Sequence, residues 1–310
     1  MNKKKLLSGP YFVWMILFTI IPLLVIAWYG FTDRTGAFTL ANVRAIASPE
    51  HLKALGLSLS LSIACTILCL LIAYPLAMIL KKTGMGKKGF VVFIFILPMW
   101  MNFLLRTYAW LNLLDDGGIL FNICRNLDLP TFSVVGTNAA IIMGMIYNFL
   151  PFMVLPLFNV LTKIDENVLN AARDLGANSA QVFFKVTLPL SLPGIISGVT
   201  MVFVPSLTTF AISDLLGARK IMLIGNIIEQ EFSTADNWHL GSGLSLVLMV
   251  FILISMAVLE HYDKNGEGTS FVLRVFFYYK IKIFFFGHVP YTDLYLFVCP
   301  DCNINYFFLQ

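Results

Sequence analysis

Charged side chains are scarce in this sequence of 310 residues, in which Asp, Glu, Lys and Arg together make up 12%. A soluble globular domain usually carries about 25% of these residues. Because 58% of the residues are hydrophobic, the few charges cannot cover a water-facing surface. This scarcity excludes an ordinary soluble enzyme, a disordered chain and a nucleic-acid-binding domain as first interpretations. It indicates a protein that crosses a lipid bilayer several times.

Motifs for catalysis and nucleotide binding are also absent. No GxxxxGK[ST] phosphate-binding loop occurs, because the Gly-rich stretch 84–88 has the wrong spacing and ends in Lys88 where Ser or Thr is needed. Neither HExxH nor GxSxG is present. We therefore predict a chain that is not an enzyme, with no catalytic residue, no cofactor and no metal ligand. If the protein consumes energy, another chain must bind the nucleotide.

Cysteine and histidine are few and dispersed. Cys65 and Cys69 lie in an apolar run, where packing is their expected role, and no disulfide framework is implied. The histidines lie in expected loops and in the C-terminal tail, so we interpret them as surface residues rather than ligands. These are His51, His239, His261 and His288.

Six apolar runs are long enough to cross about 30 Å of hydrocarbon as helices. No small-residue cleavage pattern follows the first run, so we expect a retained span rather than a signal peptide. Prolines inside several runs are tolerated in membrane helices. The expected fold is all-α, a polytopic membrane helix bundle. Its six transmembrane helices are predicted at residues 11–29, 55–80, 90–114, 138–161, 190–212 and 240–259.

Composition divides the chain into three parts. Residues 1–54 hold the N-terminal tail, the first span and an outer loop, and residues 55–262 hold the core of the membrane bundle. Residues 263–310 form a tail of different composition, with 14 aromatic residues between positions 270 and 310. The CxxC at Cys299 and Cys302 has no second pair and is a weak zinc or redox signal. We expect an aberrant or frame-shifted tail, and the alternative is a seventh, membrane-associated segment.

Positive charge is unevenly distributed between alternate connections. The N-terminal tail and the connection between the second and third runs contain seven Lys and no acid, for a sum of +7. The connections 115–136 and 213–239 sum to −4. Because Lys and Arg accumulate in cytoplasmic loops, both termini are predicted to be cytoplasmic. The connection 162–189 then lies on the cytoplasmic side as well.

The connection 162–189 is predicted to form two short helices. Asp165 can cap a helix that starts at Glu166, and Gly176 is a natural helix stop. Asn178 or Ser179 can cap a second helix, which Pro189 would end. The pair either packs on its own bundle or docks on a cytoplasmic partner. Its apolar residues are Val168, Ala172, Leu175, Phe183, Phe184 and Val186.

The same connection carries a sequence signature. Asn170-Ala171-Ala172, Gly176 and Val186-Thr187-Leu188-Pro189 resemble the E-A-A-x3-G-x9-I-x-L-P loop of binding-protein-dependent ABC importer permeases of type I. Gly176, Leu188 and Pro189 are in register, while Val186 replaces Ile and Asn170 replaces Glu. The resemblance implies that the helix pair couples the permease to an ATPase. The residues implied are Asn170, Ala171, Ala172, Asp174, Gly176, Leu188 and Pro189.

Further segments resemble the permeases of this family that import spermidine and putrescine, namely 97–100, 105–108, 150–157, 213–217 and 224–226. The resemblance implies the membrane subunit of an ATP-driven importer that translocates polyamines across a bacterial inner membrane. The implied partners are a homologous second permease subunit, a dimer of ATP-binding subunits, an extracytoplasmic polyamine-binding protein and the lipid bilayer, without nucleic acid.

Three alternatives to polyamine import follow from the same residues. The first is a permease of this family for another small solute. The second is a stand-alone secondary transporter, which should show inverted repeats and midplane charges that are not evident here. The third is an integral-membrane enzyme, which would need catalytic residues clustered at one depth.

A polyamine is a flexible polycation, so its path needs carboxylates for the ammonium groups and aromatic faces for cation–π contacts. Asp214, at the outer end of the fifth run, is the leading candidate. Arg106 would repel a polycation, and we interpret it as the partner of an acid or as reaching outward to water. The alternatives for the other candidates are an interfacial aromatic belt and solvated loop charges. These candidates are Trp100, Asn102, Tyr108, Trp110, Asp115 and Asp116.

Overall fold

The computed structural model describes residues 13–83, 97–127 and 134–262. Within these ranges every regular element is helical, apart from an isolated antiparallel bridge between Thr32 and Phe38. The predicted all-α class is therefore confirmed. The C-terminal tail 263–310, with its CxxC pair, lies outside the described residues, as does the beginning of the third apolar run.

Four helices in the described ranges are each long and apolar enough to cross a membrane. They coincide with the first, second, fourth and sixth predicted runs. The second begins well before its predicted run, because the Ser48 side chain caps it and Pro49 occupies its first turn. The four are Val13–Phe31, which comprises η1 (Ile16–Ile20) and α3 (Ile21–Phe31), α5 (Pro49–Lys82), α9 (Asn138–Lys163) and α16 (Trp238–Tyr262).

The fifth apolar run forms part of a bent helix pair. The segment Ser179–Leu190 meets α13 (Leu192–Thr208) at an angle of 63°. Pro189 does not end the first segment, so that prediction is wrong. The helix continues through a π-turn, η5 (Phe183–Thr187), into α12 (Leu188–Leu190), where the proline occupies a first-turn position that needs no N–H donor. The break comes at Ser191.

The third run is not a single straight helix in its described part. A short turn, η4 (Leu97–Trp100), is followed by α7 (Phe103–Leu114), which at 12 residues is too short to cross a membrane alone. The described ranges therefore contain four spanning helices, or five with the bent pair, and the prediction of six spans is not tested. The connection 213–239 is largely helical, because it contains most of α14 (Ala211–Leu216) and all of α15 (Ile224–Ser233).

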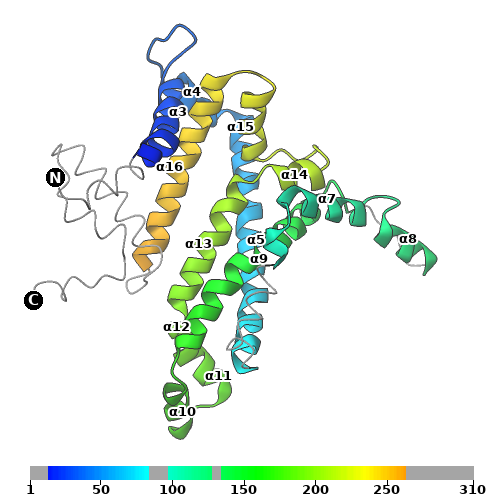
Figure 1. Cartoon of the computed structure of the whole chain (residues 1–310), viewed down its shortest axis with the longest axis vertical. Coiled ribbons are helices and arrows are strands. Elements are labelled where there is room, and N and C mark those ends of the chain that lie inside the picture. Colours follow the sequence, from blue (N-terminus) through cyan, green and yellow to red (C-terminus); the bar gives the residue numbers. More distant parts are fainter. Residues whose placement is uncertain (1–12, 84–96, 128–133, 263–310) are drawn as a thin grey trace, which may run out of the picture.

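The centre of the bundle consists of α5, α9 and α13, which lie side by side along its long axis (Figure 1). Small residues allow this close approach. A Cβ on Gly198 of α13 would lie 2.6 Å from the Met153 sulfur of α9. Cys65 and Cys69 of α5 are fully buried in the same core, which confirms their predicted packing role. Interfaces built from small residues are typical of membrane bundles.

A second group of helices, α16 with α3, packs beside this centre (Figure 1). His239 joins them, since its Nδ1 lies 2.6 Å from the Thr32 carbonyl oxygen at the end of α3. His51 similarly lies 2.6 Å from the Ala45 carbonyl. Both histidines are half-buried, so each is only partly at the surface, and each lies beside a backbone carbonyl that packing brings close. The side chains of the other two histidines lie outside the described residues.

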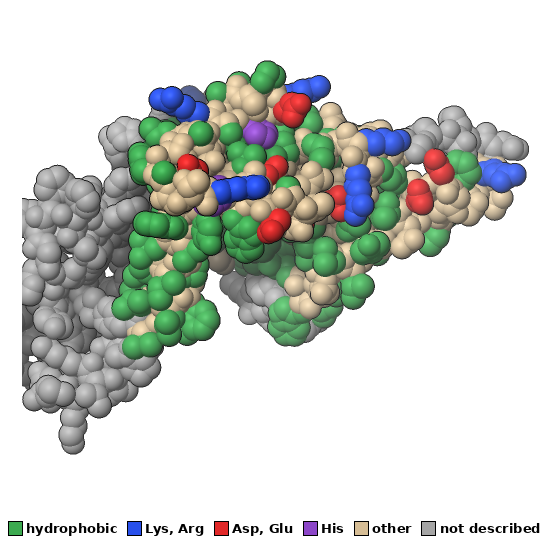
Figure 2. All heavy atoms as spheres, turned by 90° about the horizontal axis from the view of Figure 1, so that it is seen from above, with side chains coloured by type: hydrophobic (Ala, Val, Ile, Leu, Met, Phe, Trp, Pro, Cys, Tyr) green, Lys and Arg blue, Asp and Glu red, His purple; other side chains and the backbone are tan. Residues whose placement is uncertain are grey.

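Charge and hydrophobic surface are separated along the molecule. Figure 2 looks onto the end formed by α4 (Ala41–Arg44), α14 and α15, where acidic and basic side chains gather above apolar flanks. Large apolar side chains face outward from the spanning helices, among them Leu24, Ile67, Leu71 and Ile254. Such outward apolar faces are suited to lipid, in which every backbone polar group is satisfied inside the helix.

Candidate functional site

The first candidate site is the connection between α9 and α13, which begins with α10 (Glu166–Asp174). The Asp165 side chain accepts a hydrogen bond from the Asn167 N–H at 2.9 Å, which confirms the predicted cap. Gly176 adopts φ +84° after the helix. The Gly176 N–H donates to the Arg173 carbonyl and the Ala177 N–H to the Ala172 carbonyl, at 2.8 and 3.1 Å. This pair of bonds closes the helix as a Schellman motif.

The second short helix, α11 (Ser179–Val182), is capped by Asn178 rather than Ser179. The Asn178 side chain accepts from the Gln181 N–H at 2.8 Å, and the Gln181 side chain accepts from the Asn178 N–H at 2.9 Å. This reciprocal capping box satisfies two backbone donors at the helix start. Two capped helices separated by one glycine form the unit that we call the hairpin, residues 165–190.

The hairpin buries only part of its apolar surface. Leu169 and Val182 are buried against the bundle. Leu175 is 89% exposed and Phe184 is 64% exposed. The interpretation that the pair packs on its own bundle therefore holds for one face, while the other face is exposed, and docking on a partner stays a prediction.

Both ends of the hairpin are attached to the same helix, α5. At the start, Lys81 Nζ forms an ion pair with Glu166 Oε1 at 2.9 Å and donates to the Ile164 carbonyl at 3.3 Å. At the far end, the Tyr74 hydroxyl lies 2.8 Å from Ser191 Oγ, at the bend before α13. The Tyr74 ring also packs edge-on against Phe183. A displacement of the hairpin therefore acts on α5 as well as on α13.

Removing the Tyr74 hydroxyl tests this attachment. In the Tyr74→Phe variant one buried hydrogen bond is lost, while Ser191 keeps its bond to the Leu188 carbonyl. We expect the free energy of unfolding to fall by about 1 kcal/mol, as measured by thermal unfolding in detergent. Tyr147→Phe is the matched control, because its ring packs on Trp110 and its hydroxyl has no partner in the described part of the chain. Equal losses in both variants would contradict the role of Tyr74.

The predicted coupling residues lie along the hairpin in different settings. Asn170, which stands where the family has Glu, accepts a hydrogen bond from Arg173 Nη1 at 3.0 Å on the exposed side of α10. Leu188 is half-buried on the bundle side. The remaining predicted residues other than half-buried Ala172 are exposed: Ala171, Asp174, Gly176 and Pro189.

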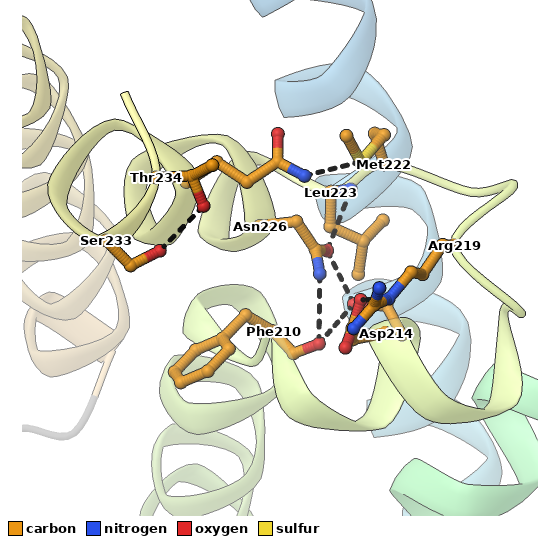
Figure 3. A network of polar contacts seen from close by, with 10 residues as sticks. Phe210, Asp214, Arg219, Met222, Leu223, Asn226, Ser233 and Thr234 are labelled. Atoms are coloured by element: carbon orange, nitrogen blue, oxygen red, sulfur yellow. Dashed lines mark hydrogen bonds and ion pairs between the residues drawn. The ribbon is translucent and has the colours of Figure 1, made fainter. Parts of the chain in front are cut away.

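The second candidate site is the opposite end of the bundle, where α14 carries Asp214. The Asp214 carboxylate pairs with Arg219, with 3.3 Å between Oδ1 and Nε (Figure 3). Arg219 is held close because the chain turns back after α14 with positive φ at Ala218 and Arg219. The leading sequence candidate is therefore paired with a neighbouring, exposed cation.

A buried polar network holds this end together (Figure 3). The Asn226 Oδ1 accepts from Ser213 Oγ at 2.6 Å and from the Leu223 N–H at 3.1 Å, while its Nδ2 donates to the Phe210 carbonyl at 3.1 Å. Beside it, a Cβ on Gly225 would lie 2.8 Å from the Thr209 carbonyl oxygen. The resembling segments 213–217 and 224–226 therefore meet in space and have a structural role.

The other predicted pathway residues are spread along α7. Asn102 caps this helix by accepting from the Leu104 N–H at 2.9 Å, and the Trp110 ring packs edge-on against Tyr147. Trp100 and Tyr108 are exposed, as are Asp115 and Asp116 after the helix end. Because these groups are distributed from before the start to beyond the end of a helix about 18 Å long, they do not surround one site.

Arg106 on α7 differs from both interpretations of the sequence. Its side chain is 7% exposed, so it does not reach outward. Its Nε has no hydrogen-bond partner, and no acid pairs with it within the described ranges. Packing of α7 on α14 and α9 buries this cation, which hydropathy along the sequence cannot reveal.

The described residues also contain no group of His, Cys, Asp or Glu suited to a metal ion.

An open, groove-like cavity of about 700 Å³ lies between α13, α15 and α16 near the same end. Among its lining residues, one is ionisable: Glu229. In the sequence, Glu229 is only one of the acids of the connection 213–239. A signal was available, because Gly225, Ile228, Glu229 and Phe232 follow helical spacing and line the cavity from one face of α15.

Comparison with known proteins identifies relatives over most of the chain. Residues 1–265 match the family described as binding-protein-dependent transport system inner membrane component. The chain is 37% identical over 270 residues to the spermidine/putrescine transport system permease protein PotB of Haemophilus influenzae, covering 84% of this chain and 94% of that protein. Identity to the Escherichia coli protein of the same description is 35% over 254 residues, covering 79% and 92%.

A solved structure shares the fold at lower sequence identity. It is a chain of a bacterial alginate ABC transporter, in complex with an alginate pentasaccharide-bound periplasmic protein. The two chains superpose with a TM-score of 0.69 at 15% identity, over 84% of this chain and 95% of that one. This likeness supports the arrangement of the helices.

Proposed function

The chain belongs to the family of binding-protein-dependent transport system inner membrane components, and from this premise we propose that it translocates polyamines as the permease subunit of an ATP-driven importer. The identity of 35–37% to spermidine/putrescine permeases over most of both chains carries the proposal. The absence of a phosphate-binding loop from the sequence agrees with a division of labour, in which a partner hydrolyses ATP.

The proposed ATPase contact is the exposed face of the hairpin. Leu175 and Phe184 present apolar surface there that the bundle does not cover. Lys and Arg gather at this end, with Lys82, Lys163, Arg173 and Lys185 on or beside the hairpin. Their position supports a cytoplasmic hairpin and cytoplasmic termini in a bacterial inner membrane. An extracytoplasmic polyamine-binding protein would then meet the opposite end, and a homologous second permease would complete the pathway.

The proposed mechanism relies on a stiff connection. Closure of an ATP-binding dimer would displace the hairpin, whose two caps and Schellman turn keep it helical under load. The Lys81 and Tyr74 contacts would carry this displacement to α5, and the bend at Ser191 would carry it to α13. Because α5 and α13 pack on α9 in the core, the central helices would move relative to the outer end and alternate the access of the pathway.

The candidate residues are not equally suited to contact a polycationic substrate. Asp115 and Asp116 are exposed carboxylates at the proposed outer end and are suited to a first contact with a polycation. Asp214 is less suited, because Arg219 already occupies its carboxylate. Trp100, Tyr108 and Trp110 offer aromatic faces for ammonium groups, and Asn102 serves the helix cap.

Uptake by the whole importer tests the function. The chain would be produced with its second permease, ATPase and binding protein in cells that lack polyamine uptake. We expect ATP-dependent accumulation of labelled spermidine or putrescine, and co-purification of the ATPase with the chain. Uptake without any bound ATPase would contradict the importer, and selective uptake of an unrelated solute would contradict the substrate.

A further inference from the structure

We propose that Glu229 binds a protonated amine of the substrate in the cavity between α13, α15 and α16. The proposal rests on the polyamine function above and names the acidic residue that contacts the substrate. Glu229 is half-buried and lines the cavity. No ion pair or hydrogen bond to its carboxylate is found within the described ranges, in contrast to Asp214 with Arg219. A carboxylate without a counter-ion in an apolar cavity favours a cationic ligand.

Two of the three hydroxyl groups that line the cavity are arranged for a hydrogen-bond donor. Thr208 Oγ1 donates to the Val204 carbonyl at 3.2 Å, and Ser245 Oγ donates to the Gly241 carbonyl at 2.8 Å. Because their protons are used by the backbone, these oxygens present lone pairs to the cavity. An ammonium group has donors and no acceptor, so it matches this lining, whereas an anion does not.

The end of α13 adds to the negative potential. The helix stops at Thr208, which lines the cavity. The last carbonyls of a helix lack partners within it, and the C-terminal end of the helix dipole is negative. Glu229 and the end of α13 therefore act on a bound cation with the same sign, whereas the start of α15 at Gly225 acts with the opposite sign.

Two aromatic rings complete the proposed cation-binding site. Phe210 and Phe232 line the cavity together with Glu229. The Phe232 ring is fixed edge-on against Trp238, with 5.4 Å between the ring centroids. In Figure 3 the Phe210 ring extends away from the Asp214–Arg219 pair, on the other side of the polar network. Aromatic faces attract ammonium groups, while Leu248 and Ile252 offer apolar contacts to the methylene segments of a polyamine.

The size of the cavity agrees with such a ligand. Its volume of about 700 Å³ lies within the range of roughly 300–1,000 Å³ for small-molecule sites. The cavity is at the α14 and α15 end, where the proposed binding protein would release its ligand.

Charge and shape at position 229 can be separated by substitution in the complete importer. Glu229→Gln keeps the size and removes the charge, and Glu229→Asp keeps the charge. We expect Glu229→Gln to lower spermidine uptake at saturating binding protein by about 10- to 100-fold, the loss of one charge-assisted contact, with Glu229→Asp retaining more activity. The matched control is Glu231→Gln on the same helix, since Glu231 is also half-buried but does not line the cavity.

The outcomes distinguish this proposal from the proposed function. If the unaltered importer takes up no polyamine, the function is wrong. If it takes up spermidine and Glu229→Gln does so at an undiminished rate, the function stands and the Glu229 site is wrong. If Glu229→Gln also loses the ATPase or the second permease on purification, the residue serves assembly and the site is overturned.

Discussion

The Gly176→Asp variant is expected to hydrolyse ATP without transporting polyamine, while the protein stays in the membrane. Gly176 has φ +84°, so a side chain there adds backbone strain on the order of 1 kcal/mol. The aspartate also places a negative charge beside Leu175, on the exposed face proposed for the ATPase. A Cβ at Gly176 has no atom within 4 Å, so the bundle itself should fold normally. We expect a loss of uptake of at least about tenfold, equivalent to 1.4 kcal/mol of coupling.

Uptake, ATP hydrolysis and membrane abundance measured in parallel check this result. Gly36→Asp is the matched control, because Gly36 also has positive φ and open space but lies at the opposite end, between α3 and α4. Gly176→Ala adds the backbone strain without the charge, and it should give an intermediate loss of uptake. Normal transport by Gly176→Asp at normal abundance would exclude the hairpin as the coupling element.

The Asn226→Leu variant is expected to give the largest loss of stability. Leucine removes the acceptor of the Leu223 N–H and the donor to the Phe210 carbonyl, at a side chain that is 4% exposed. The Leu223 N–H is then buried without a partner, while the Phe210 carbonyl still accepts from the Asp214 N–H and can accept from the Ser213 hydroxyl, which the loss of Asn226 releases. From the cost of unsatisfied buried groups we expect about 2–4 kcal/mol, a large fraction of a typical stability of roughly 5–15 kcal/mol.

Thermal unfolding in detergent measures this loss, with retention of the folded complex on gel filtration as a second indicator. Gln230→Leu on the same helix is the control, because Gln230 is exposed and its side chain has only a long contact of 4.0 Å with the Met222 sulfur. Ser213→Ala should cost less than Asn226→Leu, since the Leu223 N–H keeps its acceptor. If Asn226→Leu unfolds at the same temperature as Gln230→Leu, the network does not stabilise the outer end.

The local chemistry of the sequence predicted the hairpin well. Asp165 and Gly176 act through bonds to residues within a few positions, so their roles can be derived without knowing what surrounds them. Pro189 was misjudged because a proline can either end a helix or sit in the first turn of the next one. A π-turn precedes the proline, and the contact of Tyr74 in α5 with Ser191 lies at the bend that follows.

The candidate substrate residues were harder to predict. Asp214 and Glu229 are both acids in a predicted outer connection, and the sequence favours Asp214 only because it lies at the end of an apolar run. The chain turn that brings Arg219 to Asp214 separates them, as does the packing of α15 against α16 that places Glu229 in a cavity. The burial of Arg106 was equally hard to predict. A charge within an apolar run is unusual, but the run does not indicate which helices will bury it.

By itself, the sequence determined the membrane class, four long spanning helices and the capped hairpin, because hydropathy and capping act over one helix or one turn. Tertiary structure alone decided the bend at Ser191, the attachment of both hairpin ends to α5, the Asn226 network and the cavity at Glu229. Each of these depends on groups that are distant along the chain and come together only when the helices pack.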